Sequence, residues 1–366
     1  MSNIHYYAQD PETGIIYRTV GYTYLDELIV YPKYIPDLDG SRGQEIIKYR
    51  GINYPNGSIK FMASNSFLEG SVVKIKFSDC FHTFLPIAQK NKLILYDPTK
   101  RLLERIKENS ERGRMLNNLV SNLSKASGIG KNNFGLDASM LAGMDKRDSD
   151  IDLVVYGKEK AKIVRDFWEK MKSGNKYSIT KPSGNSKAIV KRRMSYSPLM
   201  TEEEIILWEE CKISGYFKGV KFSVMPIDCN GKYHYRYLPT GQFSGIRVKL
   251  KKNAILCDPG ILDLREHEME VLYGPSSCLI EQFVTFLPSR MGIFLEKGDQ
   301  LFITGKIYAL TGRDNNITNF ALTQFPWDDK SYRGESYFVA KKEKCDLAHM
   351  IPSLLGLEFN SSHFTE

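Results

Sequence analysis

The stretch FGLDASMLAGMDKRDSDIDLVVYG, residues 134–157, decides the predicted fold of this chain of 366 residues. Its first residues, with the KNN before them, predict a strand, and SMLAGM predicts a short helix that begins at Ser139. The polar connection MDKRDS leads into DIDLVVYG, which predicts a second strand. Because the side chains of a strand alternate between its two sides, Asp150 and Asp152 point to the same side.

This arrangement predicts a site for a metal ion and a phosphate. Two carboxylates held side by side repel each other unless a cation lies between them. Mg²⁺ takes one or two carboxylates in proteins and completes its shell with water and phosphate oxygens. The N–H groups at the start of the predicted helix and the Ser139 hydroxyl would form an anion site next to it. The alternative from the residues alone is a polar loop that caps a buried strand.

The order of these elements resembles the signature of the nucleotidyltransferase superfamily, which includes DNA polymerase beta, CCA-adding enzymes and minimal nucleotidyltransferases. SDIDLVV is similar to the carboxylate strand of that family, and Gly143 lies where many members have a glycine four residues after the serine. The whole chain also resembles an archaeal group of predicted nucleotidyltransferases with β-rich additions at both ends. The phrases GYTYLDELIVYPKYIPD and EKGDQLFITGK carry this wider resemblance.

The resemblance implies an α+β fold with a nucleotidyltransferase core of mixed sheet and flanking helices. It also implies that Asp150 and Asp152 hold two Mg²⁺ ions and that Ser139 contacts a phosphate of an NTP. The residue before this serine, Ala138, belongs to the same nucleotide-binding turn. The implied reaction moves an NMP from the NTP to a hydroxyl acceptor, and pyrophosphate leaves.

Three positions depart from the family pattern. Ala138 stands where the family has glycine, and Asp137 adds a negative charge beside the phosphate turn. Active relatives carry a third carboxylate on a neighbouring antiparallel strand, and GVKFSVMPID, residues 219–228, is the candidate for that strand. Its alignment places Ser223 where an aspartate is expected. Asp228 is the other candidate for the third catalytic carboxylate, although parity places it on the opposite face of the strand.

The rest of the chain divides into two β-rich regions around this core. Residues 1–97 contain β-branched and aromatic runs between turn sequences, which predict a β-rich domain. Residues 98–235 form the predicted transferase-like domain, with a long or broken helix over 98–128. Residues 236–366 predict a small barrel with a C-terminal tail, and their GDQLFITGK phrase is common in OB-like barrels.

The charge balance allows a polyanionic partner. The formal net charge is +8, and the run from Lys181 to Pro198 contains Lys191, Arg192 and Arg193 but no acidic residue. Lys191 and Arg192 are candidate nucleotide ligands, or contacts to the backbone of RNA or DNA. The alternative is that this run is a solvated loop.

Three functions follow from the sequence: an active nucleotidyltransferase, a degenerate transferase fold that binds nucleic acid or a partner, and a structural role. The sequence lacks a run of about 18 apolar residues and a signal peptide, so we expect a cytoplasmic protein without membrane contact. The six cysteines are scattered without a CxxC pair, which does not fit a zinc site.

Overall fold

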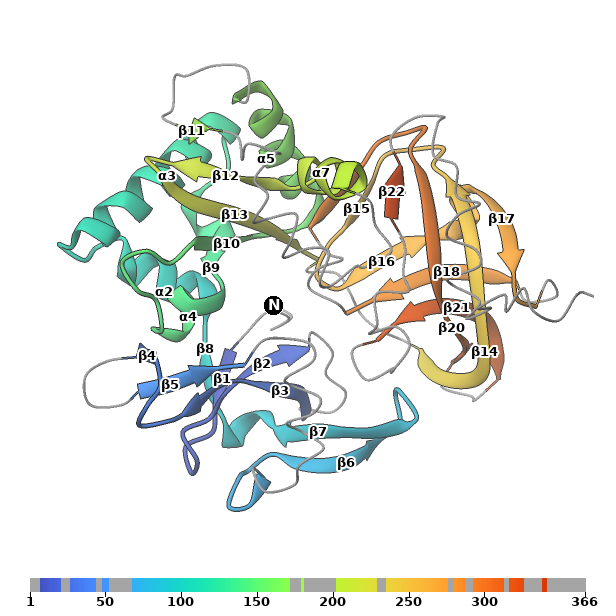
Figure 1. Ribbon diagram of the computed structural model, residues 1–366, viewed down its shortest axis with the longest axis horizontal. Coiled ribbons are helices and arrows are strands. Elements are labelled where there is room, and N and C mark those ends of the chain that lie inside the picture. Colours follow the sequence, from blue (N-terminus) through green and yellow to red (C-terminus); the bar gives the residue numbers. More distant parts are fainter. Residues whose placement is uncertain are drawn as a thin grey trace, which may run out of the picture.

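The protein is built from three β-sheet units, and most of the described helices flank the central one (Figure 1). It is a mixed α and β protein that is rich in strands. The computed structural model describes residues 7–20, 27–43, 48–52, 68–171, 179–180, 202–228, 235–275, 279–286, 292–312, 316–325 and 338–340.

The N-terminal unit is an eight-stranded antiparallel sheet. Its order is β4-β5-β3-β2-β1-β8, and β7 pairs with both β3 and β6. The predicted strand runs of residues 1–97 form these strands, and a short 3₁₀ turn at Lys90–Lys92 precedes the last one. The strands are β1 (Tyr7–Gln9), β2 (Ile16–Val20), β3 (Glu27–Pro36), β4 (Arg42–Gly43), β5 (Lys48–Gly51), β6 (Lys74–Ser78), β7 (Thr83–Gln89) and β8 (Ile94–Tyr96).

The central unit is a five-stranded sheet in the order β11-β12-β13-β10-β9. Its helices pack their apolar residues, among them Leu116, Val164 and Trp168, against the strands. The helices are α2 (Pro98–Arg105), α3 (Glu111–Ser127), α4 (Ala138–Ala142), α5 (Lys158–Met171) and α7 (Glu202–Glu210), with a 3₁₀ turn at Lys131–Asn133. The strands are β9 (Phe134–Leu136), β10 (Ile151–Tyr156), β11 (Ile179–Thr180), β12 (Ile213–Phe217) and β13 (Val220–Ile227).

Local capping explains why the helical pattern over residues 98–128 is broken into two helices. Asp97 caps α2 by accepting a hydrogen bond from the Lys100 N–H at 2.9 Å. Ser110 caps α3 in the same way, with the Gly113 N–H at 2.9 Å. Gly128 ends α3 with a left-handed φ of 72°, which glycine adopts without steric cost. The helical region predicted over residues 98–128 is therefore confirmed, and of the two forms that the sequence left open the structure has the broken one.

The direction of β13 was predicted wrongly. The resemblance implied a neighbour antiparallel to the aspartate strand, but β13 runs parallel to β10, with Asp152 opposite Ser223. The antiparallel partner of β10 on its other side is β9. A parallel neighbour requires a crossover connection, and the chain between the two strands is long enough because it contains α5, α7 and β12.

The C-terminal unit is a half-barrel, whereas the sequence predicted a small barrel. Its seven-stranded sheet has the order β16-β18-β21-β20-β14-β17, with β22 added to β20 and a separate β15-β19 pair. The strands are β14 (Arg236–Lys249), β15 (Ala254–Leu256), β16 (Gly260–Asp263), β17 (Glu268–Tyr273), β18 (Ile280–Thr285), β19 (Ile293–Leu295), β20 (Gln300–Thr311), β21 (Ile317–Gln324) and β22 (Phe338–Ala340), with a 3₁₀ turn at Leu264–Glu266.

The three units share their hydrophobic cores. Tyr7, Ile16 and Tyr34 of the N-terminal sheet belong to the same buried cluster as the helices of the central unit. Tyr31, on the same strand as Tyr34, belongs to a second buried cluster that the sheet shares with the half-barrel. In Figure 1 the N-terminal sheet lies below both other units. The N-terminal sheet therefore packs against both other units and is not an independent domain beside them.

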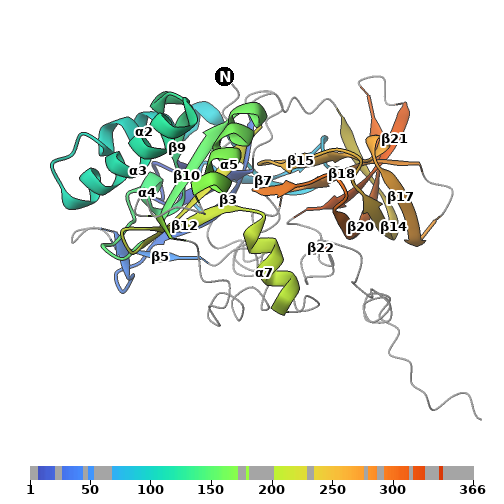
Figure 2. The same cartoon turned by 90° about the horizontal axis from the view of Figure 1, so that it is seen from above.

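Helix α7 joins the central unit to the half-barrel. Its Ile205 lies in the core of the half-barrel, although the sequence predicted this segment as part of the transferase-like domain, and Figure 2 shows the helix beside that unit. The Arg165 guanidinium of α5 donates to the carbonyls of Glu210 and Lys212 at 3.0 and 2.9 Å, at the end of α7. The same guanidinium lies over the ring of Phe294 in β19, 5.5 Å from its centre.

Arg18 connects all three units electrostatically. It extends from β2 to Asp258, which precedes β16, with 3.4 Å between Nη2 and Oδ2, and both side chains are almost fully buried. The charge of Asp137, in the central unit, also acts on this guanidinium. Among the described helices, none is long and apolar enough to cross a membrane.

We predict that Arg18→Met destabilises the protein by about 3 kcal/mol or more, because removal of one partner leaves buried carboxylates without their counter-charge. Urea denaturation at pH 7.5 measures this change. The control is Arg50→Met, since Arg50 forms an ion pair with Asp37 in which 60% of the arginine side chain is exposed. That substitution should cost about 1 kcal/mol or less. Equal losses for the two variants would contradict the role of Arg18.

Candidate functional site

The predicted carboxylates lie on the face of the central sheet that points away from α3 and α5. Ile151, Leu153 and Val155 of β10 are buried against the helices. Asp152 alternates with these residues and therefore points to the other side, as does Val154, which packs against Ile227. This second face is directed toward the N-terminal sheet and the half-barrel.

Four polar side chains form a small array at the start of β10 and β13. Ser223 donates its hydroxyl hydrogen to Oδ1 of Asp152 at 2.8 Å. Lys221, two residues earlier on β13, places its Nζ 3.5 Å from Oδ2 of Asp150. Because side chains alternate along both parallel strands in the same register, each aspartate has a polar neighbour on β13. Lys221 was not among the predicted site residues, although its spacing from Ser223 places it on the same face.

The environment of Asp152 disfavours its negative charge. Burial and the charges of Asp137 and Asp150 raise the pKa of Asp152 to about 6, while the Ser223 hydrogen bond and Lys221 act in the opposite direction. Asp137 is 7% exposed, and its backbone N–H donates to the carbonyl of Asp152 at 2.8 Å. Three acidic side chains are therefore concentrated here, and a bound cation would relieve their repulsion.

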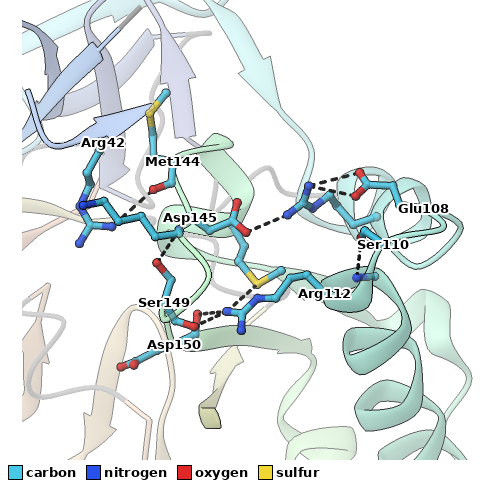
Figure 3. Close-up of polar contacts among 12 residues, drawn as sticks. Arg42, Glu108, Ser110, Arg112, Met144, Asp145, Ser149 and Asp150 are labelled. Atoms are coloured by element: carbon cyan, nitrogen blue, oxygen red, sulfur yellow. Dashed lines mark hydrogen bonds and ion pairs between the residues drawn. The ribbon is translucent and has the colours of Figure 1, made fainter. Parts of the chain in front are cut away.

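The loop between α4 and β10 is held by arginines from three other elements (Figure 3). Arg112 of α3 donates to the carbonyls of Ser149 and Asp150, and Arg105 of α2 forms an ion pair with Asp145 at 2.8 Å. Arg42 of β4 donates from Nη1 to the carbonyl of Met144 at 3.4 Å. These contacts fix the backbone just before β10 and leave the Asp150 carboxylate pointing away from Arg112 (Figure 3).

The short helix that was predicted after β9 is present, and the backbone at its start has an unusual conformation. Helix α4 begins at Ala138, one residue before the predicted start at Ser139, and the Ser139 side chain is buried. Ala138 has a left-handed φ of 49°, a conformation that favours glycine. The alanine adopts this conformation with strain.

Asp228 does not join the aspartate pair. It follows β13 at the end where Ile227 lies opposite Tyr156, about 16 Å along the strand from Ser223 at ~3.3 Å per residue. Its carboxylate forms an ion pair with Lys158 at 2.9 Å. The position next to Asp152 is occupied by Ser223, as the sequence alignment predicted. Lys191 and Arg192 lie outside the described residues.

The described residues provide ligands for one divalent ion more readily than for two. Among them, no group of three or more His, Cys, Asp and Glu side chains has the arrangement of a metal site. The carboxylates of Asp150 and Asp152 could hold one Mg²⁺ that takes its other ligands from water and phosphate. A second ion needs a further carboxylate bridge, and the Ser223 hydroxyl is a poor substitute for it.

Comparison of the chain with protein-family models, with curated proteins and with solved structures found no match. The resemblance to nucleotidyltransferases therefore stays a prediction that depends on residues 134–157 and on the positions described above.

We predict that Asp152→Asn stabilises the metal-free protein by about 1–2 kcal/mol at pH 7.5, because the amide removes a disfavoured charge and still accepts the Ser223 hydrogen bond. The folded-state pKa of Asp152 is raised from 3.8 to about 6. The wild type therefore loses stability as the pH rises from about 4 to 6, and the advantage of the variant should appear over that range.

Urea denaturation in EDTA at pH 3.5 and 7.5 measures this difference. Asp148→Asn, which changes an exposed carboxylate in the preceding loop, is the control and should have little effect at either pH. A variant that is less stable than the wild type at pH 7.5 would contradict the electrostatic argument.

We predict that Ala138→Gly stabilises the protein by about 0.5–1 kcal/mol. Relief of a left-handed alanine gains about 1–2 kcal/mol, and the greater freedom of glycine in the unfolded chain offsets part of this gain. The matched control is His82→Gly, because His82 has the same φ of 49° in the turn between β6 and β7. The urea midpoint should rise for both variants at an unchanged m-value. A lower midpoint for Ala138→Gly would show that the methyl group contributes packing instead.

Proposed function

We propose that this protein is a nucleotidyltransferase that binds a nucleoside triphosphate with Mg²⁺ at Asp150 and Asp152 and transfers the NMP to a hydroxyl acceptor. The observation that carries the proposal is the pair of aspartates on one face of β10, beside buried Asp137, with the pKa of Asp152 raised to about 6. The order of the elements around them, which is β9, α4, a loop and β10, supports a nucleotidyltransferase-type core for the central unit.

The proposed reaction uses contributions from the residues of the chain and from the metal ion that they would bind. Mg²⁺, when bound, supplies positive charge to the triphosphate and lowers the pKa of a coordinated hydroxyl. Asp150 and Asp152 hold the ion, and Arg112 fixes the backbone carbonyls of Ser149 and Asp150 so that this pair keeps its position. The acceptor oxygen forms a bond to the α-phosphorus while the bond to the bridging oxygen breaks, and pyrophosphate leaves with the electron pair.

The proton of the acceptor hydroxyl has no carboxylate to receive it at position 223, where the family pattern has the third aspartate. Ser223 stands next to Asp152 on β13 and cannot accept a proton as a carboxylate can. The proton then passes to solvent, and general-base assistance typically contributes about 10²- to 10⁴-fold to the rate. We therefore propose a slow transferase rather than a fast polymerase.

A second function is supported by Lys221. Its ammonium group lies 3.5 Å from Asp150 and already supplies a positive charge where a metal ion would. Together with the Ser223 hydrogen bond, this contact partly satisfies both aspartates without an ion. In that case the central unit would be a degenerate transferase fold that binds RNA, DNA or a partner protein. Its nucleic-acid affinity would depend on salt and on Lys191, Arg192 and Arg193, and not on Asp152.

Isothermal titration with each of the four NTPs, with and without Mg²⁺, tests the transferase proposal. We expect binding that requires Mg²⁺ and that weakens about tenfold or more in Asp150→Asn and Asp152→Asn, since each loses a charged ligand. Asp148→Asn should bind as the wild type does. If no NTP produces heat with the wild type, the proposal fails.

Ser223→Asp separates the two functions. It restores a carboxylate opposite Asp152, so an active site that lacks only this group should gain about tenfold or more in the rate of NMP transfer, measured with a radiolabelled α-phosphate. Ser223→Asn is the control of similar size without the charge. A degenerate binding protein would show no transfer with either variant, and its nucleic-acid affinity would remain unchanged.

A further inference from the structure

The N-terminal sheet places basic side chains opposite the aspartate pair. Strand β3 has a register shift where Pro32 lies opposite Tyr17, so Tyr31 and Tyr34 both point to the inner face of the sheet. Lys33 lies within this irregularity. Arg42 follows on β4, at the edge of the same sheet. No feature of the sequence linked either residue to the 134–157 stretch.

Lys33 lies in the electrostatic field of the carboxylates. Its Nζ donates to the carbonyl of Ile52 at 3.1 Å. Burial and the nearby Arg18 lower the pKa of Lys33 to about 8, while the charges of Asp137 and Asp152 favour its protonated form. The ammonium group is therefore close enough to the proposed metal site for Asp152, one of its two acidic residues, and for the neighbouring Asp137 to act on it.

Arg42 reaches the same region from the other side. Its Nη1 donates to the carbonyl of Met144, in the loop between α4 and β10, and Figure 3 shows the side chain extending from the N-terminal sheet to this loop. The charges of Arg42, Asp137 and Asp152 all act on the hydroxyl of Tyr34. Arg42 and the two aspartates therefore act on the same hydroxyl at the junction of the two sheets, and the same aspartates act on Lys33.

A buried hydroxyl at this junction is an independent indication of a ligand. Tyr7 is 1% exposed, and among the residues that the structure describes its hydroxyl has no hydrogen-bond partner. Its ring stacks on Tyr34 with 6.3 Å between the centres, and the charges of Asp137 and Arg18 act on it. Buried polar groups are normally satisfied, so this hydroxyl is expected to meet a ligand atom or an ordered water.

The phosphate turn of the central unit is a weak anion site by itself. Helix α4 has only five residues, and Asp137 adds a negative charge at its start. A triphosphate carries several negative charges, of which one Mg²⁺ neutralises only part. The remaining charge requires side chains from elsewhere, and Lys33 and Arg42 are cations on the facing sheet.

We propose that the N-terminal sheet supplies the triphosphate-binding half of the site, with Lys33 and Arg42 as phosphate ligands and the Tyr7 hydroxyl as a further donor. This inference rests on the proposed nucleotide site and adds the group that recognises the substrate. Arginine and lysine both bind phosphate, arginine through two parallel N–H groups and lysine through a single charge. The nucleotide would then lie between two units, each contributing one type of charge.

Titration with Mg²⁺ and inorganic tripolyphosphate, and with Mg²⁺ and ATP, tests this inference. Lys33→Met and Arg42→Gln should each weaken binding of both probes by about tenfold or more, the effect of losing a charge-assisted hydrogen bond. Lys33→Arg keeps the charge and should remain close to the wild type. The matched control is Lys76→Met, since Lys76 belongs to the same sheet but forms an exposed ion pair with Glu27.

The outcomes separate this inference from the proposed function. If the wild type binds both probes and both charge-removing variants bind as tightly, the triphosphate does not contact the N-terminal sheet and the inference is overturned alone. If the wild type binds neither probe, the nucleotide site and this inference fail together. Circular dichroism of each variant shows whether it is folded, and recovery of binding in Lys33→Arg distinguishes loss of charge from loss of structure.

Discussion

The buried guanidinium of Arg18 is the constraint on which the arrangement of the three units depends. A charge in this position is costly unless it is paired, and its partners, Asp258 and Asp137, come from the two other units. The N-terminal sheet therefore cannot move away from either unit without exposing apolar surface and separating buried charges. The same constraint holds the inner face of this sheet next to the start of β10, where the candidate site lies.

Local patterns in the sequence predicted the elements of the central unit well. The strand, short helix, polar loop and strand of residues 134–157 are present, and the caps at Asp97 and Ser110 explain the break in the helical region that follows residue 97. The direction of β13 was predicted wrongly because pairing between strands about 70 residues apart leaves no local signal. The sharing of cores among the three units is equally non-local, since alternating apolar residues show that a face is buried but not what covers it.

The candidate site was predictable only in its central part. Asp150, Asp152 and the position of Ser223 follow from strand periodicity and from the family pattern. Lys221 could have been found, because it lies two residues from Ser223 and strand parity puts it on the same face. Lys33 and Arg42 could not, since their relation to Asp152 depends on the packing of one sheet against another. The acidic residues of the candidate site are therefore local in the sequence, whereas the basic residues proposed to face them are not.

The balance between Lys221 and a divalent ion decides what the site can do. An ammonium group near Asp150 and a divalent ion compete for the same carboxylate, and the ion brings twice the charge and several vacant coordination positions. Lys221 keeps about a quarter of its side chain exposed, so it can turn away into water at modest cost. Ser223 has no such freedom, because it is held by Asp152 and by the register of two strands. In the proposed transferase, metal binding would thus be limited by a reversible contact, whereas the lack of a third carboxylate beside Asp152 would limit catalysis permanently.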